Sequence, residues 1–160
     1  MVVVILGICA AVILPQISNR DDLKTAAMAR VVMNDIAYAQ NLAVSRQARV
    51  FVRFDVANKR YDLLDRVSPS DTFVIHPVRR TAFRVPIGGM RKDGLKDVML
   101  ESAAFDTRTA VMFDEMGVPH AYNPSNGSAA PLVSGSVALK CRAYGLTITI
   151  DPYSGELKVN

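Results

Sequence analysis

Hydrophobic and polar residues divide the chain into three stretches of different periodicity. Residues 1–14, MVVVILGICAAVIL, carry no charge and present no polar face. From Leu23 to Gln47 apolar residues recur at helical spacing, and from residue 48 onward short segments alternate between apolar and polar. The pattern predicts an α+β fold, in which a long N-terminal α-helix packs on an antiparallel β-sheet domain. The first half of that helix is apolar and the second half is amphipathic.

The amphipathic half has one face for a core and one face for water. Met28, Val32, Ile36, Ala39 and Ala43 fall on one side of the helix. The opposite side carries Arg30, Asn34, Asn41 and Ser45. Ser18 is the expected N-cap, and Asp21 and Asp22 follow where the helix dipole favours negative charge.

Strands are expected throughout the remainder of the chain. They are predicted at 48–55, 60–64, 72–75, 82–85, 98–104, 110–113, 135–142, 146–150 and 156–159. Turns are expected at Asn58–Lys59, Tyr144–Gly145 and 152–155, and a flexible loop tip at Ile87–Met90. Between Met116 and Ser134, glycines and prolines recur among many small polar residues and predict one long loop.

The apolar opening does not suit a soluble domain or a cleaved signal. A core helix would show a polar face, and a secretory signal would begin with a basic region and end at a small-x-small site. As a helix, 14 residues cover about 21 Å, whereas a hydrocarbon core is about 30 Å thick. We therefore expect a membrane helix whose beginning lies before Met1. Residues 1–47 would form a helix of about 70 Å if unbroken, and Pro15 is expected to kink or unwind it.

Composition adds little that is specific. The chain has 160 residues, enough for one domain and an appendage, and 19 Lys+Arg against 15 Asp+Glu give a net charge of +4. This charge mildly favours anionic surfaces without indicating nucleic acid. The two cysteines, Cys9 and Cys141, lie at opposite ends of the chain, so a disulfide framework and a zinc site are not expected.

Candidate chemistry is sparse. His76 and His120 are the two histidines, and a catalytic use of either remains an alternative to two ordinary loop histidines. No nucleophile elbow, phosphate loop or metal-ligand spacing occurs. We therefore expect no enzyme activity, no cofactor, no metal and no small-molecule substrate.

A basic cluster is the one charged feature with a candidate partner. Its members are Arg79, Arg80, Arg84, Arg91 and Lys92. They form either an ordinary solvated surface or a contact for an anionic partner, such as DNA or lipid. Only Phe83 is interleaved among them, which does not favour a stacking platform for single strands.

The opening VVVILGICAAVILPQIS resembles the N-terminal helix of type IV pilins and type II secretion pseudopilins, with Gly7, Ala10, Ala11 and Pro15 where that pattern has them. The stretches LAVSRQARVFVRFD, AVMFDEMGVP and ITIDPYSGELKV resemble the helix-to-strand junction and later strands of the pseudopilin H and FimT-type minor pilin group. These matches follow the family's order along the chain. Residues 66–96 resemble nothing in it.

The resemblance implies a minor pseudopilin or minor pilin. Residues 1–22 would be the membrane and assembly helix, 23–47 the amphipathic helix joining the domain, and 48–160 the β domain. The precursor would be anchored by a single pass in the bacterial inner membrane, with the β domain outside the cytoplasm, before it enters a type II secretion or type IV pilus fibre. Inner-membrane lipid and other pilin-like subunits would be the partners of the apolar residues Val2, Val3, Val4, Ile5, Leu6, Gly7, Ile8, Ala10, Ala11, Val12, Ile13, Leu14 and Pro15.

Two further expectations come from the family. Its N-terminal methylation motif, with the peptidase-cut glycine and the assembly glutamate, is missing before the apolar run, so we expect in-frame codons for Gly-Phe-Thr-Leu-x-Glu upstream of Met1. Some FimT-type minor pilins take part in DNA uptake. A membrane-anchored DNA-binding minor pilin is therefore the alternative function, with the basic cluster as the contact.

Overall fold

The computed structural model describes residues 20–66, 71–89 and 94–160. The predicted membrane and assembly segment from Val2 to Pro15 lies outside the described residues, as do Ser18, Arg91 and Lys92. Within the described ranges, no helix has both the length and the apolar character needed to cross a membrane.

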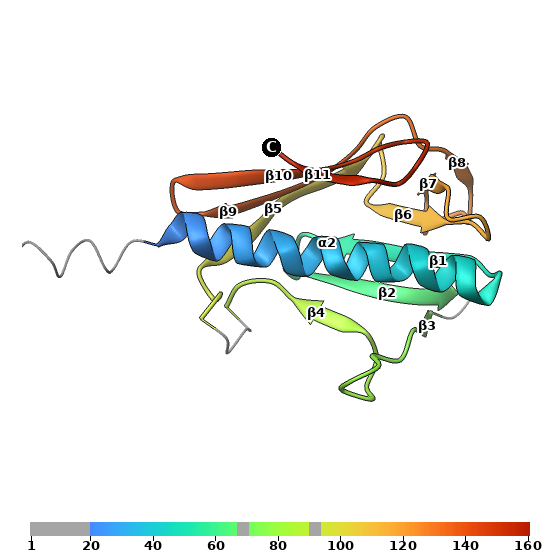
Figure 1. The fold of residues 1–160 in the computed structure, drawn as a ribbon, viewed down its shortest axis with the longest axis horizontal. Coiled ribbons are helices and arrows are strands. Elements are labelled where there is room, and N and C mark those ends of the chain that lie inside the picture. Colours follow the sequence, from blue (N-terminus) through green and yellow to red (C-terminus); the bar gives the residue numbers. More distant parts are fainter. Residues whose placement is uncertain (1–19, 67–70, 90–93) are drawn as a thin grey trace, which may run out of the picture.

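Helix α2, Asp21–Arg46, runs along the domain from one end to the other (Figure 1). Asp21 and Asp22 lie in its first turn, as predicted, whereas the predicted cap Ser18 lies outside the described residues. The helix ends at Gln47, whose left-handed backbone lets its N–H reach the carbonyls of Ala43 and Val44. The predicted apolar face is confirmed, because the buried residues of α2 are Thr25, Met28, Ala29, Val32, Ile36, Ala39 and Ala43.

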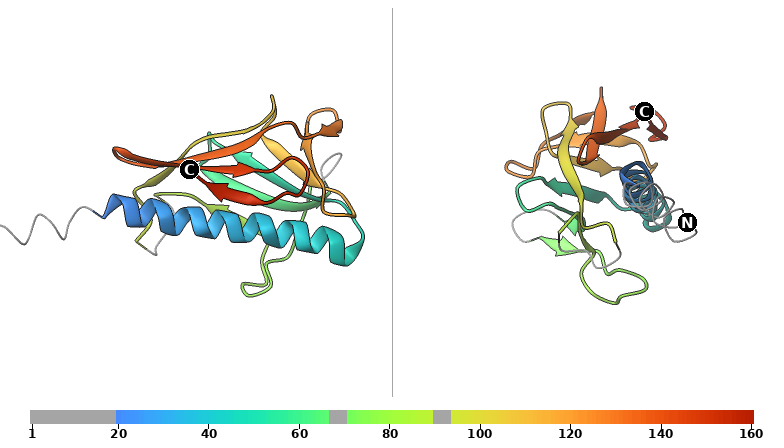
Figure 2. Two further views of the ribbon diagram at one scale, coloured as in Figure 1. Left: turned by 45° about the horizontal axis from the view of Figure 1, so that its top comes forward. Right: turned by 90° about the vertical axis from the view of Figure 1, so that its left-hand side faces the viewer.

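Two antiparallel sheets pack against this helix (Figures 1 and 2). One has seven strands in the order β3-β2-β1-β6-β7-β8, with β4 also paired to β2. Its strands are β1 Val50–Asp55, β2 Arg60–Arg66, β3 Thr72–Phe73, β4 Arg84–Pro86, β6 Ala110–Phe113, β7 Pro119–Tyr122 and β8 Ala129–Pro131. The other has four strands in the order β11-β10-β9-β5, namely β5 Val98–Phe105, β9 Gly135–Cys141, β10 Tyr144–Ile150 and β11 Leu157–Val159.

The main core lies between α2 and the two sheets. Alternation along β1 sends Val50, Val52 and Phe54 into this core and Phe51 to the other face of the sheet. On that other face a smaller apolar cluster forms from Phe51, Leu64, Ala110, Met112 and Tyr122, with Phe73 packed against it. Charged residues continue this outer face beyond the cluster. The packing of one long helix on two antiparallel sheets confirms the α+β fold predicted from the pattern.

Three local predictions are wrong. The segment 116–134 holds β7 and β8 rather than one loop. Pro119 is tolerated as the first residue of β7, and Pro131 as the last residue of the edge strand β8. The turn between β9 and β10 lies at residues 142–143 and not at 144–145, since Tyr144 pairs with Cys141. Arg142 there adopts φ 52°, the left-handed backbone that so tight a hairpin requires.

The predicted flexible tip at 87–90 is also wrong where the structure describes it. Ile87 belongs to the main core, and Gly88 is buried with φ +80°. A Cβ on Gly88 would lie 2.5 Å from the carbonyl oxygen of Val98, so only glycine fits this approach of two backbones.

Candidate interaction surfaces

The described members of the basic cluster occupy two different settings. Arg79 and Arg80 lie on a protruding hairpin, residues 75–82, which we call the basic hairpin. Arg84 begins β4 on the outer face of the seven-stranded sheet and is held by Asp62. The structure therefore divides the cluster, and two of its arginines remain together at an exposed site.

The basic hairpin is internally ordered and tied to α2. The backbone N–H of His76 donates to the carbonyl of Thr81 at 2.8 Å, and the His76 Nδ1 accepts from the N–H groups of Val78 and Arg79. The His76 ring stacks on Phe83 at 4.5 Å between centroids, and Phe83 stacks on Tyr38 of α2 at 5.8 Å. These contacts support a tip at which Val78 is 82% exposed.

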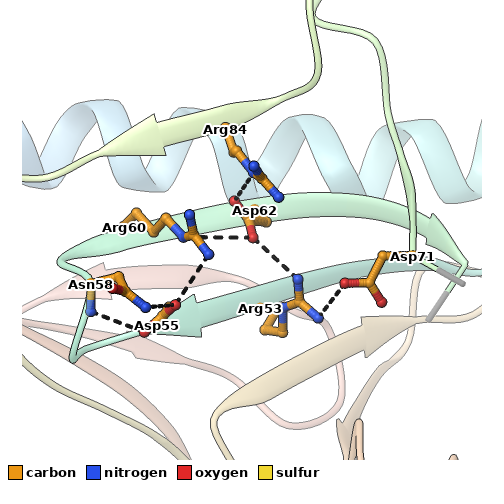
Figure 3. Close-up of polar contacts among 7 residues, drawn as sticks. All are labelled: Arg53, Asp55, Asn58, Arg60, Asp62, Asp71 and Arg84. Atoms are coloured by element: carbon orange, nitrogen blue, oxygen red, sulfur yellow. Dashed lines mark hydrogen bonds and ion pairs between the residues drawn. The ribbon is translucent and has the colours of Figure 1, made fainter. Parts of the chain in front are cut away.

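A buried carboxylate organises the outer face of the seven-stranded sheet (Figure 3). The side chain of Asp62, on β2, is only 1% exposed. It receives a hydrogen bond from Arg53 Nη2 at 3.2 Å and lies 3.3 Å from Arg84 Nε. Arg84 in turn covers the Phe73 ring, with its guanidinium carbon 4.3 Å from the centroid. Charge pairing and cation–π contact thus link β1, β2, β3 and β4.

Two more carboxylates complete this group of charges. Arg53 Nη1 lies 2.7 Å from Asp71, and Arg60 Nη2 lies 3.3 Å from Asp55. Burial disfavours the charge of Arg53, but hydrogen bonds to Asp71 and Asp62 outweigh this cost and raise its pKa. Hydrogen bonds from Asn58 lower the pKa of Asp55. Arg53, Arg60 and Arg84 balance Asp55, Asp62 and Asp71, so the network offers no net charge to an ionic ligand.

A depression of about 540 Å³ lies beside this network. Its lining includes Arg53, Asp55, Arg60 and Thr109. Asp62 is not part of this lining; its Oδ1, which is ion-paired with Arg84, and Arg60 Nε are buried and make no hydrogen bond among the described residues. The arginines in its lining are thus paired with carboxylates of the same network.

A second ordered surface lies on the other side of α2. It consists of two turns, residues 114–118 and 151–156, which we call the turn pair. Asp114 Oδ1 accepts from the N–H groups of Met116 and Val118 at 3.0 and 2.8 Å. Asp151 Oδ1 accepts from the N–H groups of Tyr153 and Ser154 at 3.0 and 2.9 Å, and the Ser154 hydrogen bonds lower the pKa of Asp151. Each turn is thus closed by the aspartate at its start.

One helix residue holds both turns. Gln40 Nε2 donates to the carbonyl of Gly117 at 2.9 Å and to that of Ser154 at 2.8 Å. Gly117 and Gly155 both have positive φ, and a Cβ on Gly155 would lie 2.5 Å from Gln40 Nε2. With their backbones fixed in this way, the turns hold Met116 84% exposed and Tyr153 87% exposed.

The two histidines occupy unrelated settings. His76 stacks on Phe83 in the basic hairpin, whereas His120, on β7, places Nδ1 3.1 Å from the carbonyl of Val118. Neither histidine lines the depression beside Asp62. In the described part of the chain no group of three His, Cys, Asp or Glu side chains suits a metal ion.

Sequence reasoning missed Asp62 and Gln40. Asp62 could have been found from the register of the predicted hairpin, because pairing β1 with β2 places Arg53 directly opposite Asp62. Gln40 carried no such signal, since its partners are 77 and 114 residues away in the sequence.

Comparison with known proteins gives a likeness of fold. No family model matches the sequence, and no curated protein matches it. A solved structure, the type IV minor pilin FimU of Pseudomonas aeruginosa, is similar with a TM-score of 0.51 at 14% identity. The match covers 84% of this chain and 91% of that chain. This protein therefore has a pilin-like α+β fold, with one long helix packed against antiparallel sheets.

Proposed function

We propose that this chain is a structural subunit of a type II secretion or type IV pilus-like fibre, a minor pseudopilin or minor pilin of the pseudopilin H and FimT group. The observation that carries the proposal is the likeness of fold to a type IV minor pilin over most of both chains. The charge-free run of residues 1–14 agrees with it, since only six residues separate that run from Asp21 at one end of the domain.

The mechanism that follows is assembly, without catalysis. The apolar segment anchors the precursor in the inner membrane, and the β domain lies outside the cytoplasm. During assembly this segment leaves lipid and packs against the equivalent helices of other subunits. Lipid is already apolar, so the hydrophobic effect does not drive this exchange, and close packing together with motor work must supply the free energy.

The proposal is tested by fractionation of the full chain expressed with a fibre machine. We expect it in alkali-washed membranes and in sheared fibres. Replacing Ile8 and Val12 with Asp should remove it from both, because each carboxylate costs about 2.5–3.5 kcal/mol near the bilayer centre. A matched pair of Asp substitutions at Asn34 and Asn41, on the exposed face of α2, should leave membrane fractionation unchanged. Recovery of the wild-type chain only as a dissolved particle without detergent would refute the proposal.

The alternative function, DNA contact, has one observation in its favour. Arg79 and Arg80 are exposed on the basic hairpin, and residues 72–89 contain no carboxylate. Duplex binding by the full chain in detergent, measured at several salt concentrations, tests this idea. Changing Arg79 and Arg80 to Ala should weaken binding and reduce the salt slope by up to about 2. No binding at low salt would eliminate the DNA function and leave the fibre function intact.

A further inference from the structure

We propose that the basic hairpin of one copy of this chain docks on the turn pair of a second copy. The inference rests on the proposed fibre function and goes further, because it names the two surfaces of the β domain that meet. It depends on three features of these surfaces: exposed apolar anchors, opposite charge and their placement around α2.

Both surfaces expose apolar side chains on an ordered backbone. The turn pair presents Met116 and Tyr153, and the basic hairpin presents Ile75, 57% exposed, and Val78. Apolar anchors on a fixed backbone lose little conformational entropy when they bind, and Tyr and Met are enriched at protein interfaces. Isolated exposed apolar residues are common on any protein, but here each surface carries two on locked turns.

The two surfaces carry opposite charge. The turn pair contains Asp114, Glu115, Asp151 and Glu156 and no Lys or Arg. Arg49 and Lys158 offset two of these four carboxylates, at 3.7 Å from Glu115 and 3.3 Å from Glu156. The basic hairpin contains two exposed arginines and no carboxylate. A negative surface with apolar anchors thus matches a positive surface with apolar anchors, and both belong to the same chain.

The surfaces lie on opposite flanks of α2. Tyr38 faces the basic hairpin through Phe83, and Gln40 holds the turn pair. Two positions along a helix turn by about 200°, which places these contacts on either side of the buried residue Ala39. The views in Figures 1 and 2 agree, with the hairpin below α2 and the 151–155 turn above it.

This placement determines the kind of contact. Two different patches on one chain make a heterologous, head-to-tail interface, which repeats from copy to copy unless the rotation closes a ring. Such an interface suits lateral contact between β domains in a fibre and does not suit a two-fold dimer.

Cysteine cross-linking tests the contact in the full chain, purified in nonionic detergent with Cys9 changed to Ser. One copy carries Val78→Cys and a second, differently tagged copy carries Tyr153→Cys. We expect the mixed disulfide to form roughly tenfold faster than with the matched control, Ala57→Cys mixed with Tyr153→Cys, because Ala57 is exposed on the β1–β2 turn.

Charge reversal separates docking from random collision. Arg79→Glu with Arg80→Glu in the Val78→Cys copy should lower the rate of mixed-disulfide formation to that of the control pair. Adding Glu115→Arg with Glu156→Arg to the Tyr153→Cys copy should restore the faster rate. The inference would be overturned if the Val78–Tyr153 pair and the control pair formed disulfides at equal rates, or if neither charge reversal changed the rate. The inference would also be overturned if duplex DNA bound Arg79 and Arg80 while cross-linking stayed at the control rate.

The outcome is separable from the fate of the fibre proposal. A chain that enters sheared fibres without the Val78–Tyr153 cross-link keeps its proposed function and loses this interface. A chain that cross-links as expected but never enters fibres keeps the interface and loses the proposed function.

Discussion

The clamp formed by Gln40 gives a prediction that can be worked out in energies. Replacing Gly155 with Ala should destabilise the fold in two ways. Alanine in the left-handed backbone, here φ +72°, costs about 1–2 kcal/mol. The new Cβ also meets Gln40 Nε2 and displaces it from the carbonyls of Gly117 and Ser154. Two hydrogen bonds at about 0.5–1.5 kcal/mol each add roughly 1–3 kcal/mol.

A double-mutant cycle isolates the second contribution. In a Gln40→Ala background the two hydrogen bonds are already gone, so Gly155→Ala should cost only the backbone strain of about 1–2 kcal/mol. The coupling between positions 40 and 155 should therefore equal the hydrogen-bond contribution. Gly127→Ala is a matched control, because its φ is +70° but its Cβ would lie 3.8 Å from the nearest atom, Tyr122 Oη.

Urea unfolding of the full chain in nonionic detergent, followed by tyrosine fluorescence and circular dichroism, measures all of these variants. Buried Tyr61 makes the fluorescence sensitive to the core. The cost of Gly127→Ala should be the same with and without the Gln40→Ala substitution, whereas the cost of Gly155→Ala should fall when Gln40→Ala is present. Equal costs of Gly155→Ala in both backgrounds would show that Gln40 does not clamp the turn.

Three further predictions follow from the charged and titratable groups. Asp62→Asn should lower the free energy of unfolding by about 2–3 kcal/mol, because it leaves arginines facing a buried uncharged group. The control Asp65→Asn, in an exposed ion pair, should cost under about 0.5 kcal/mol, and similar urea midpoints for the two variants would contradict the prediction. Because the pKa of Asp151 is lowered in the folded state, its contribution to the free energy of unfolding is present above its unfolded pKa of about 3.9 and is lost as the pH falls through the lower folded pKa. Asp151→Asn should therefore flatten the acid side of the plot of unfolding free energy against pH. An unchanged acid side would contradict the role of the turn's hydrogen bonds. Burial raises the pKa of the Cys141 thiol, so in the Cys9→Ser protein iodoacetamide at pH 8 should label it much more slowly when native than in urea, and equal rates would show that this strand end is open.

Local patterns in the sequence determined the elements with strong periodicity. The face of α2 that carries Met28, Val32 and Ile36 was predicted because helical spacing is a property of neighbouring residues. The hairpin of β1 and β2 followed in the same way from its alternation and its turn. The sequence also set the fold class, because an amphipathic helix followed by alternating strands can bury its apolar faces only by packing one on the other.

Tertiary structure decided what brings distant residues together. Proline and glycine content concealed β7 and β8, since a proline is tolerated at the first residue of a strand, as in β7, and on an edge strand, as in β8. The basic cluster looked continuous along the chain, yet the sheet took Arg84 to Asp62 and left Arg79 and Arg80 on the basic hairpin. Gln40 joins two turns whose positions depend on every strand between them, and no local pattern records a contact of that kind.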